Sequence, residues 1–451
     1  MNKKRKQKKK KPGIIKKILL ILLSIILLLI IAALISFYLW KSNLISSLEH
    51  GSQIIQTSVG PVEYAKMGKG PVILISHGGA TGYDNIYMYK DLVDEGFTLL
   101  CPSRPGYLRT PLDVGPTFEE QADMMAALLD ALKIKEKVFM LGISLGGPTA
   151  LQFALRHPDR CKGLIMQDAV SKKYLPSQKA KDSFLGKLFL SKFGSDLSGW
   201  IQYLAVKYAP ASVFDEYLQV ETFYDKDKTK QLAEEIMKDP KEVEKLKALI
   251  NMISPISKRK TGLDSEMEYA AKIPRYPLEK IKVPTLVTQS KVDRDVEFKN
   301  GEFVAKTVPN AEFYIFDGLG HLFWFGDEWQ TIYSKMVSFL KKHSKPVTVI
   351  KNKFLFETTW VSNMDGAMLT INPNGTFTID YPSVESTAST QGTYKIEGNK
   401  IIFLNKPGSD ICDGIEGTYR INLKVNALEF LLISDKCKSR KKHFKEGWFR
   451  L

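Results

Sequence analysis

Apolar residues follow three different patterns along the chain. Residues 18–40 carry no charge, and because roughly 20 apolar residues suffice to cross a bilayer, this segment predicts a membrane-spanning helix. From about 71 to 340, short apolar runs alternate with helix-like stretches, which is typical of βα units and a parallel sheet. From Phe354 onward, short alternating strands with hairpin signals such as Asn374-Gly375 predict an antiparallel barrel or compact sandwich without a long helix.

These patterns divide the 451 residues into five segments. We expect a basic tail (1–17), a transmembrane signal-anchor (18–40), a linker (41–56), a larger α/β domain (57–345) and a small β domain (346–451).

The strand rhythm of the α/β domain lapses at about 171–277, which predicts a helical insertion over one end of the sheet. Aromatic residues are frequent there and form either the insertion's own core or an apolar pocket. The helices expected in the insertion are Ala180–Phe193, Asp196–Tyr208, Thr229–Lys238 and Lys241–Met252.

Charge is concentrated at the N-terminus. The formal net charge is +16, and ten Lys or Arg without any acid lie in residues 1–17, so the rest of the chain carries only +6. Nucleic-acid binding is therefore not indicated. The positive-inside rule keeps the tail cytoplasmic and places the remainder outside the cell membrane. The alternative is a cleavable signal peptide, which usually has a shorter apolar region and a small-residue cleavage site.

Ser144 lies in Gly142-Ile143-Ser144-Leu145-Gly146, between a buried apolar run and a helix-like stretch. A Gly-x-Ser-x-Gly motif in this context is typical of a sharp strand-to-helix turn that presents the serine as a nucleophile. Gly142 and Gly146 fit because a Cβ would collide across so tight a turn.

A serine nucleophile needs a base, and His321 is the candidate among six histidines. It alone follows an expected strand, 311–316, in a loop of small residues. A carboxylate should orient the imidazole. Asp293 follows the strand expected at 283–289, while Asp295 in the same loop and Asp168 after another strand remain alternatives.

Backbone donors for an oxyanion are expected at two places. The N–H of Leu145 follows the nucleophile, and the N–H of Gly79 lies in a glycine loop after the early strand 72–76.

Together these residues resemble the α/β-hydrolase superfamily over about 57–340, in the order nucleophile, acid, histidine. The Pro102-Ser103-Arg104-Pro105-Gly106-Tyr107 turn is also similar to that family. The resemblance implies an eight-stranded, mostly parallel sheet with a helical cap, with Ser144, Asp293 and His321 as a catalytic triad. Motifs near 369–377 and 434–437 and the closing Trp448-Phe449-Arg450 make the β domain similar to small bacterial lipocalin-like modules.

The four cysteines divide into two pairs. Cys412 and Cys437 share the β domain, where an exported location permits a disulfide. Cys101 ends one expected strand and Cys161 precedes the start of another, which puts them at opposite edges of a parallel sheet, so we predict no bond between them. No Cys/His spacing resembles a zinc site, and neither a metal nor a cofactor is expected.

The sequence therefore predicts a membrane-anchored, extracytoplasmic serine esterase that acts on a small apolar ester. Amide or aminopeptidase-type hydrolysis, or acyl transfer, could use the same residues. A binding protein without catalysis, with the β domain as its functional end, is the alternative from another class.

Overall fold

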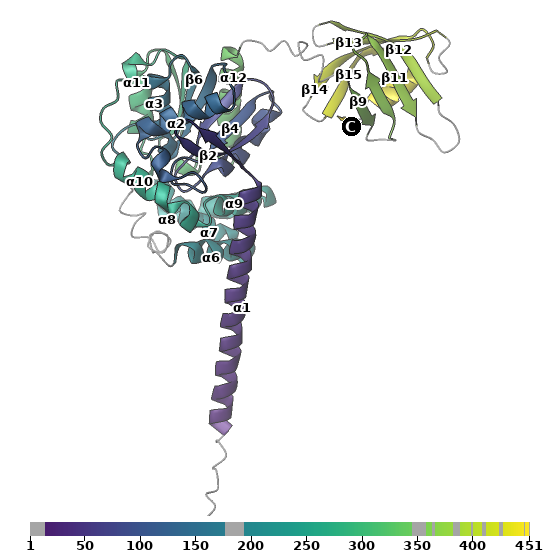
Figure 1. The fold of residues 1–451 in the computed structure, drawn as a ribbon. Helices are drawn as coiled ribbons and strands as arrows, with labels where there is room; N and C mark the ends of the chain where they lie inside the picture. The colour runs from purple at the N-terminus through teal and green to yellow at the C-terminus, as the bar shows by residue number, and fades with distance from the viewer. Residues whose placement is uncertain are drawn as a thin grey trace, which may run out of the picture.

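The fold is described from a computed structural model of the full chain (Figure 1). It describes residues 14–175, 194–344, 358–362, 366–381, 388–397, 400–407, 412–423, 427–445 and 447–450. The basic tail lies largely outside these residues, as does the helix expected at Ala180–Phe193.

A single long helix, α1 (Ile14–His50), leads into the folded part of the chain. Its apolar side chains are exposed over most of its length, and it is long and apolar enough to cross a membrane. The helix continues through His50, and β1 follows at Gln53, so the segment expected to be a linker is mostly helix and strand.

The central sheet has eight strands in the order β1-β2-β4-β3-β5-β6-β7-β8. Antiparallel pairs join β1 to β2 and β2 to β4, and every later pair is parallel. The eight strands confirm the predicted fold class. Their bounds are β1 Gln53–Thr57, β2 Gly60–Gly68, β3 Val72–Ser76, β4 Thr98–Pro102, β5 Val138–Ile143, β6 Cys161–Gln167, β7 Thr285–Ser290 and β8 Ala311–Phe316.

Both faces of the sheet are covered, because successive residues of each buried strand point to opposite sides. Leu74 of β3 belongs to the same buried cluster as residues of α2 (Phe118–Ala131), α3 (Gly147–Arg156) and α11 (Lys299–Thr307), whereas Ile73 and Ile75 belong to the cluster on the other face. The second face is covered by η1 (Tyr83–Val93) and α12 (Glu328–His343).

A helical cap connects β6 to β7 and lies over the carboxyl ends of the strands. Three described helices correspond to expected ones, whereas α7 and α10 were not predicted. The cap helices are α6 Ser195–Tyr208, α7 Pro210–Glu221, α8 Lys226–Ile236, α9 Pro240–Met252 and α10 Lys260–Ala270.

The C-terminal strands form a closed antiparallel barrel. Aromatic rings fill its interior: Phe403 contacts Phe377, Tyr419, Phe430 and Phe444. Phe444 belongs to a short helix, α14 (Lys438–Phe444). The strands are β9 Thr359–Ser362, β10 Met368–Ile371, β11 Thr376–Tyr381, β12 Ala388–Glu397, β13 Lys400–Asn405, β14 Glu416–Leu423, β15 Ala427–Asp435 and β16 Trp448–Arg450.

The cysteines lie as the sequence suggests. Cys412 and Cys437 form a disulfide within the barrel domain. Cys101 and Cys161 are buried in the central sheet as free thiols.

Candidate active site

Ser144 stands at the turn between β5 and α3. Its φ of +49° lies in the left-handed region, which non-glycine residues rarely adopt. The turn is tight on both sides: a Cβ on Gly142 would lie 2.6 Å from the Cβ of Ala150, and one on Gly146 would lie 2.1 Å from the Ser76 carbonyl oxygen. The two glycines of the motif therefore permit this turn, and the turn pushes the Ser144 hydroxyl out of the sheet.

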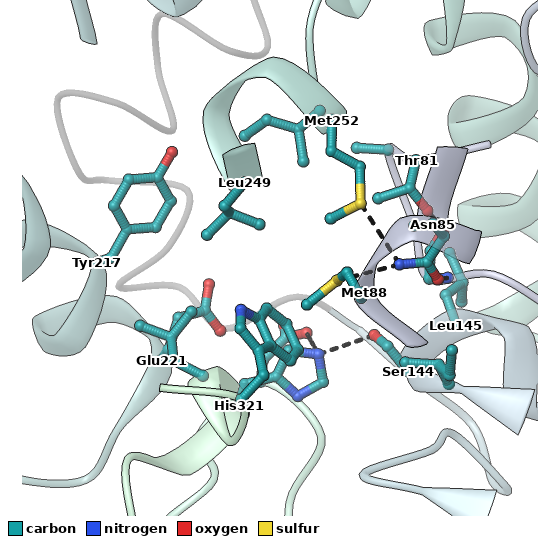
Figure 2. Close-up of a pocket in the computed structure, with 18 of the residues that line it drawn as sticks. Thr81, Asn85, Met88, Ser144, Leu145, Tyr217, Glu221, Leu249, Met252 and His321 are labelled. Carbon is teal, nitrogen blue, oxygen red and sulfur yellow. Dashed lines mark hydrogen bonds and ion pairs between the residues drawn. The ribbon is translucent and has the colours of Figure 1, made fainter. Parts of the chain in front are cut away.

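The ring of His321 faces the Ser144 hydroxyl (Figure 2). It follows β8 in a short helical turn, and its Nε2 lies 2.9 Å from Ser144 Oγ. Its Nδ1 lies 2.8 Å from Oδ2 of Asp293, which is fully buried in the loop after β7. The structure thus brings together the three residues that the sequence singled out, in the geometry of a nucleophile, a base and an orienting acid.

The two alternative acids occupy different places. Asp295 Oδ2 lies 3.7 Å from His321 Nε2, on the Ser144 side of the ring, and Asp295 accepts a hydrogen bond from the Tyr174 hydroxyl. Asp168 follows β6, and its Oδ1 accepts a hydrogen bond from the backbone N–H of Ser290 at 2.8 Å. Burial, followed by the charge of Asp293, raises the pKa of Asp168 well above its usual range.

Charges around His321 determine its protonation. Burial alone would lower the pKa of its imidazole, but Asp293, Asp295 and Glu221 outweigh burial and raise that pKa well above its ordinary value. An imidazolium formed during proton transfer is therefore strongly stabilised at this position.

The glycine loop after β3 lies directly beside the nucleophile. A Cβ on Gly78 would be 3.6 Å from the Ser144 Cβ, and one on Gly79 would be 3.4 Å from a methyl carbon of Leu145. Gly79 and Leu145, the two expected amide donors, therefore line the same small region as Ser144.

His77, at the start of that loop, has a structural position. Its Nε2 accepts a hydrogen bond from the Arg104 amide at 3.0 Å. Burial, followed by the charge of Arg104, lowers the pKa of His77 well below its usual range, so the ring is neutral. The Arg104 side chain also donates to the His77 carbonyl oxygen and forms a buried ion pair with Glu266 of α10 at 2.6 Å. This network joins the loop to the cap.

A cavity of about 380 Å³ opens above Ser144 between the cap and the sheet. Apolar side chains dominate its wall. Acidic residues also line it, and they are Glu216, Glu221 and Asp295; no Lys or Arg is among the described lining residues.

Glu221 also lines this cavity and was not predicted from the sequence. It ends α7, and a strand-like bridge between Thr222 and Asp293 holds this end of the helix against the acid loop. Its Oε2 is buried without a hydrogen-bond partner among the described residues. Burial, followed by the charge of Asp295, raises the pKa of Glu221 to about 8.

The cap aromatics divide between the two roles considered. Phe214 is buried in the cap core, whereas Tyr217 lines the cavity, as does Trp324 from the loop after His321. Tyr208 and Phe223 are exposed instead. Phe184, Phe189 and Phe193 lie outside the described residues.

No group of three or more His, Cys, Asp or Glu side chains is arranged to hold a metal ion within the part of the chain that the structure describes.

Comparison with known proteins identifies the family. A family model described as the alpha/beta hydrolase fold matches residues 71–327, which is more than half of the chain. The chain belongs to this family, and it is a hydrolase of the alpha/beta hydrolase type.

Its relatives include proteins of known and unknown activity. It is 28% identical over 285 residues to the uncharacterized hydrolase YcgS of Bacillus subtilis, which covers 62% of this chain and 95% of that protein. It is 27% identical over 272 residues to 2-hydroxy-6-oxo-6-phenylhexa-2,4-dienoate hydrolase of Comamonas testosteroni, covering 58% and 84%. Among solved structures, an alpha/beta hydrolase fold protein from Nakamurella multipartita superposes with a TM-score of 0.59 at 29% identity, over 65% of this chain and all of that one.

Proposed function

We propose that this protein is a membrane-anchored, extracytoplasmic serine hydrolase that cleaves carboxylic esters of apolar substrates. The observation that carries the proposal is the contact chain Ser144 Oγ–His321 Nε2 at 2.9 Å and His321 Nδ1–Asp293 Oδ2 at 2.8 Å.

The reaction follows from this arrangement. Ser144 Oγ bonds to the carbonyl carbon as His321 takes its proton, and the amides of Gly79 and Leu145 stabilise the oxyanion. The carbonyl re-forms as the ester C–O bond breaks, and His321 returns the proton to the leaving alcohol. Water then attacks the acyl carbon while His321 accepts its proton. The acid departs as that proton returns to Ser144.

The cavity favours a neutral, apolar ester. Its described wall is mainly apolar and carries acidic residues without a Lys or Arg. An anionic substrate, such as the dienoate in the name of the Comamonas relative, would meet like charges there.

The proposed membrane location of the protein rests on α1 and the basic residues before it. The uncharged segment 18–40 spans about 35 Å as a helix, enough for the hydrocarbon core of a bilayer. The ten basic residues at its N-terminal side favour a cytoplasmic tail, and this places the hydrolase domain outside.

The test is a series of p-nitrophenyl esters of increasing acyl length, assayed with the full chain and with its Ser144→Ala variant. We expect hydrolysis by the wild type, with an optimum for acyl chains longer than acetyl, and a loss of at least about 10³-fold in the variant. Equal rates for both proteins on every ester would contradict the proposal.

One observation favours a second candidate, an aminopeptidase-type amide hydrolase. Glu221 lines the cavity with His321, and its Oε2, which has no hydrogen-bond partner among the described residues, could bind an amine next to the scissile bond. Amino-acid p-nitroanilides distinguish the two, because this candidate predicts their hydrolysis and a loss of binding in Glu221→Gln, whereas the ester proposal predicts neither.

A further inference from the structure

The helix α1 contacts the cap through α6. Lys41 of α1 forms an ion pair with Asp196 of α6 at 2.6 Å. The Trp40 ring lies 6.1 Å from that of Tyr203, and nearer the middle of α1 the Phe37 ring packs against α6. The anchor helix is therefore part of the enzyme's packing, and its remaining apolar length projects away from the domain beyond α6 (Figure 1).

These contacts locate the membrane boundary. Trp40 and Lys41 close the uncharged stretch, and Trp and Lys are typical of the interface between hydrocarbon and headgroups. The helix α6, which touches them, has an apolar stripe that faces solvent. Leu197, Ile201 and Tyr208 of this stripe are 37%, 42% and 78% exposed, at spacings of four and seven residues. Such a stripe suits a helix that lies on a membrane surface.

A second cavity, of about 860 Å³, lies just above this boundary. One wall is Leu44 and Leu48 of α1, four and eight residues past Trp40, which is about 6 to 12 Å along the helix. The opposite walls come from η1 and α9 and include Tyr87 and Ala248. Tyr83 fixes the position of α1 here, because its hydroxyl donates to the Leu48 carbonyl oxygen at 2.6 Å.

The two cavities share a wall. Met88, Leu249, Met252 and Trp324 line both the cavity beside α1 and the one above Ser144. The two methionine sulfurs face Asn85, whose amide nitrogen lies 3.3 and 3.5 Å from them (Figure 2). Methionine side chains are flexible, and contacts to sulfur are weak, so this wall can rearrange at low cost.

We propose that the cavity beside α1 binds the alkyl chain of an ester substrate taken from the bilayer, and that the chain reaches Ser144 past Met88 and Met252. The inference rests on the proposed ester hydrolysis and on the membrane span of α1, and it assigns the substrate class as long-chain, membrane-partitioned esters. Charged side chains also line this cavity, and they are Asp84, Lys90, Asp91, Lys241, Glu244 and Lys245. The alkyl chain would therefore follow the apolar side, along Leu44, Leu48 and the wall that the two cavities share.

The test compares two esters with the full chain in phosphatidylcholine vesicles: p-nitrophenyl palmitate in the bilayer and p-nitrophenyl butyrate in solution. Ser47→Trp and Ala248→Trp fill the second cavity from opposite walls, at exposed positions that do not line the cavity above Ser144. The matched controls are Ser46→Trp and Lys247→Trp, the neighbouring positions, which line neither cavity.

We expect kcat/KM for the palmitate to fall about tenfold in both filled variants, because each buried methylene contributes roughly a factor of four. The butyrate rate should stay near wild type, and both controls should match wild type on both esters. An equal fall for both esters, or an unchanged palmitate rate, would overturn the inference.

A second measurement separates this inference from the proposed function. A diazirine-bearing fatty acid in the same vesicles should crosslink to peptides that contain residues 44–48 and 240–252, and Ser47→Trp should abolish the adducts. If neither ester is hydrolysed but these adducts form, the ester proposal fails while the lipid cavity stands. Adducts confined to residues 18–40 would overturn the cavity.

Discussion

Three carboxyl groups surround the imidazole of His321, and they have unequal roles. Asp293 lies at Nδ1, whereas Asp295 lies 3.7 Å from Nε2, the nitrogen that faces Ser144. Glu221 adds a third acidic group from the cap. Because a general base must be neutral to accept a proton, carboxylates that raise its pKa also raise the pH at which the free enzyme becomes active.

We predict that Asp295→Asn moves the acid limb of the kcat/KM–pH profile to lower pH. The substitution removes a negative charge that raises the pKa of His321, so the imidazole becomes neutral at a lower pH. The measurement is the profile on a soluble ester with both proteins. Glu297→Gln, at an exposed position in the same loop, is the control and should leave the limb in place. An upward shift for Asp295→Asn would refute this reading of the charges.

We also predict that Asp293→Asn lowers kcat by about 10⁴-fold, because the amide no longer orients the imidazole as an acceptor for the serine proton. Asp168→Asn is the matched control, because Asp168 is equally buried and interacts with Asp293 but does not bond to His321. It should keep kcat within about tenfold of wild type. Single-turnover rates on an activated ester measure both, and equal losses would remove Asp293 from its role.

At this scale the sequence predicts the serine and the histidine better than the acid. Ser144 has a local motif, and His321 is singled out by the strand before it. Asp168, Asp293 and Asp295 all follow parallel strands, whose carboxyl ends meet at one edge, so sequence alone places all three near the imidazole. Only the structure shows that Asp293 Oδ2 meets the Nδ1 of His321. Glu221 had no signal, because its role depends on where the cap folds over the sheet.

At the scale of elements, a buried network holds the cap to the sheet. Glu266 of α10 pairs with Arg104 at 2.6 Å and also accepts hydrogen bonds from Tyr107 and Gln121. None of these side chains reaches solvent. Removing one partner of a buried pair leaves an uncompensated charge, which costs far more than losing an exposed pair.

We therefore predict that Glu266→Ala lowers the free energy of unfolding by about 3 to 5 kcal/mol. Glu268→Ala, in the same helix, breaks an exposed ion pair with Lys272 and should have little effect. Urea unfolding followed by tryptophan fluorescence measures both. Similar stabilities for the two variants would mean that the cap is not held by the Arg104–Glu266 pair.

The elements that the sequence did not predict have physical explanations. The end of α6 at Tyr208 agrees with the expected one, but α7 begins at Pro210 after Ala209 alone, so no loop sets it apart as a separate helix. In α10, Gly262 lowers helix propensity. The structure shows why a glycine fits there: a Cβ would lie 2.2 Å from the ring of Tyr107. Close packing against another element, which no local pattern contains, decides this position.

At the scale of the whole molecule, α1 and the barrel differ in what the sequence predicts. The apolar run 18–40 predicts a membrane span. Phe37 and Trp40 belong to that run, and nothing in the sequence indicates that they contact α6. The barrel's strands follow from alternation and turn signals. The aromatic side chains inside the barrel could not be predicted from these signals. Rings such as Phe403 and Phe444 occupy the interior that a lipocalin-like module would offer to a ligand.

The disulfide of the barrel domain should stabilise that domain alone. It closes a loop of 25 residues, for which chain entropy suggests about 3 kcal/mol. We predict that a Cys412→Ser/Cys437→Ser double variant loses about that much stability in the barrel transition and keeps its rate on soluble esters. Thermal unfolding monitored by calorimetry, beside an ester assay, checks both parts. A loss of hydrolysis in the folded variant would give the barrel a direct role in catalysis.

The most direct test of the serine mechanism is covalent labelling of the full chain with a fluorophosphonate, followed by peptide mass spectrometry. An activated serine reacts at phosphorus, and an ordinary one does not. We predict one adduct on the peptide that contains Ser144, absent in Ser144→Ala and strongly slowed in His321→Ala. An unlabelled wild-type chain, or an adduct whose rate ignores His321, would contradict the account.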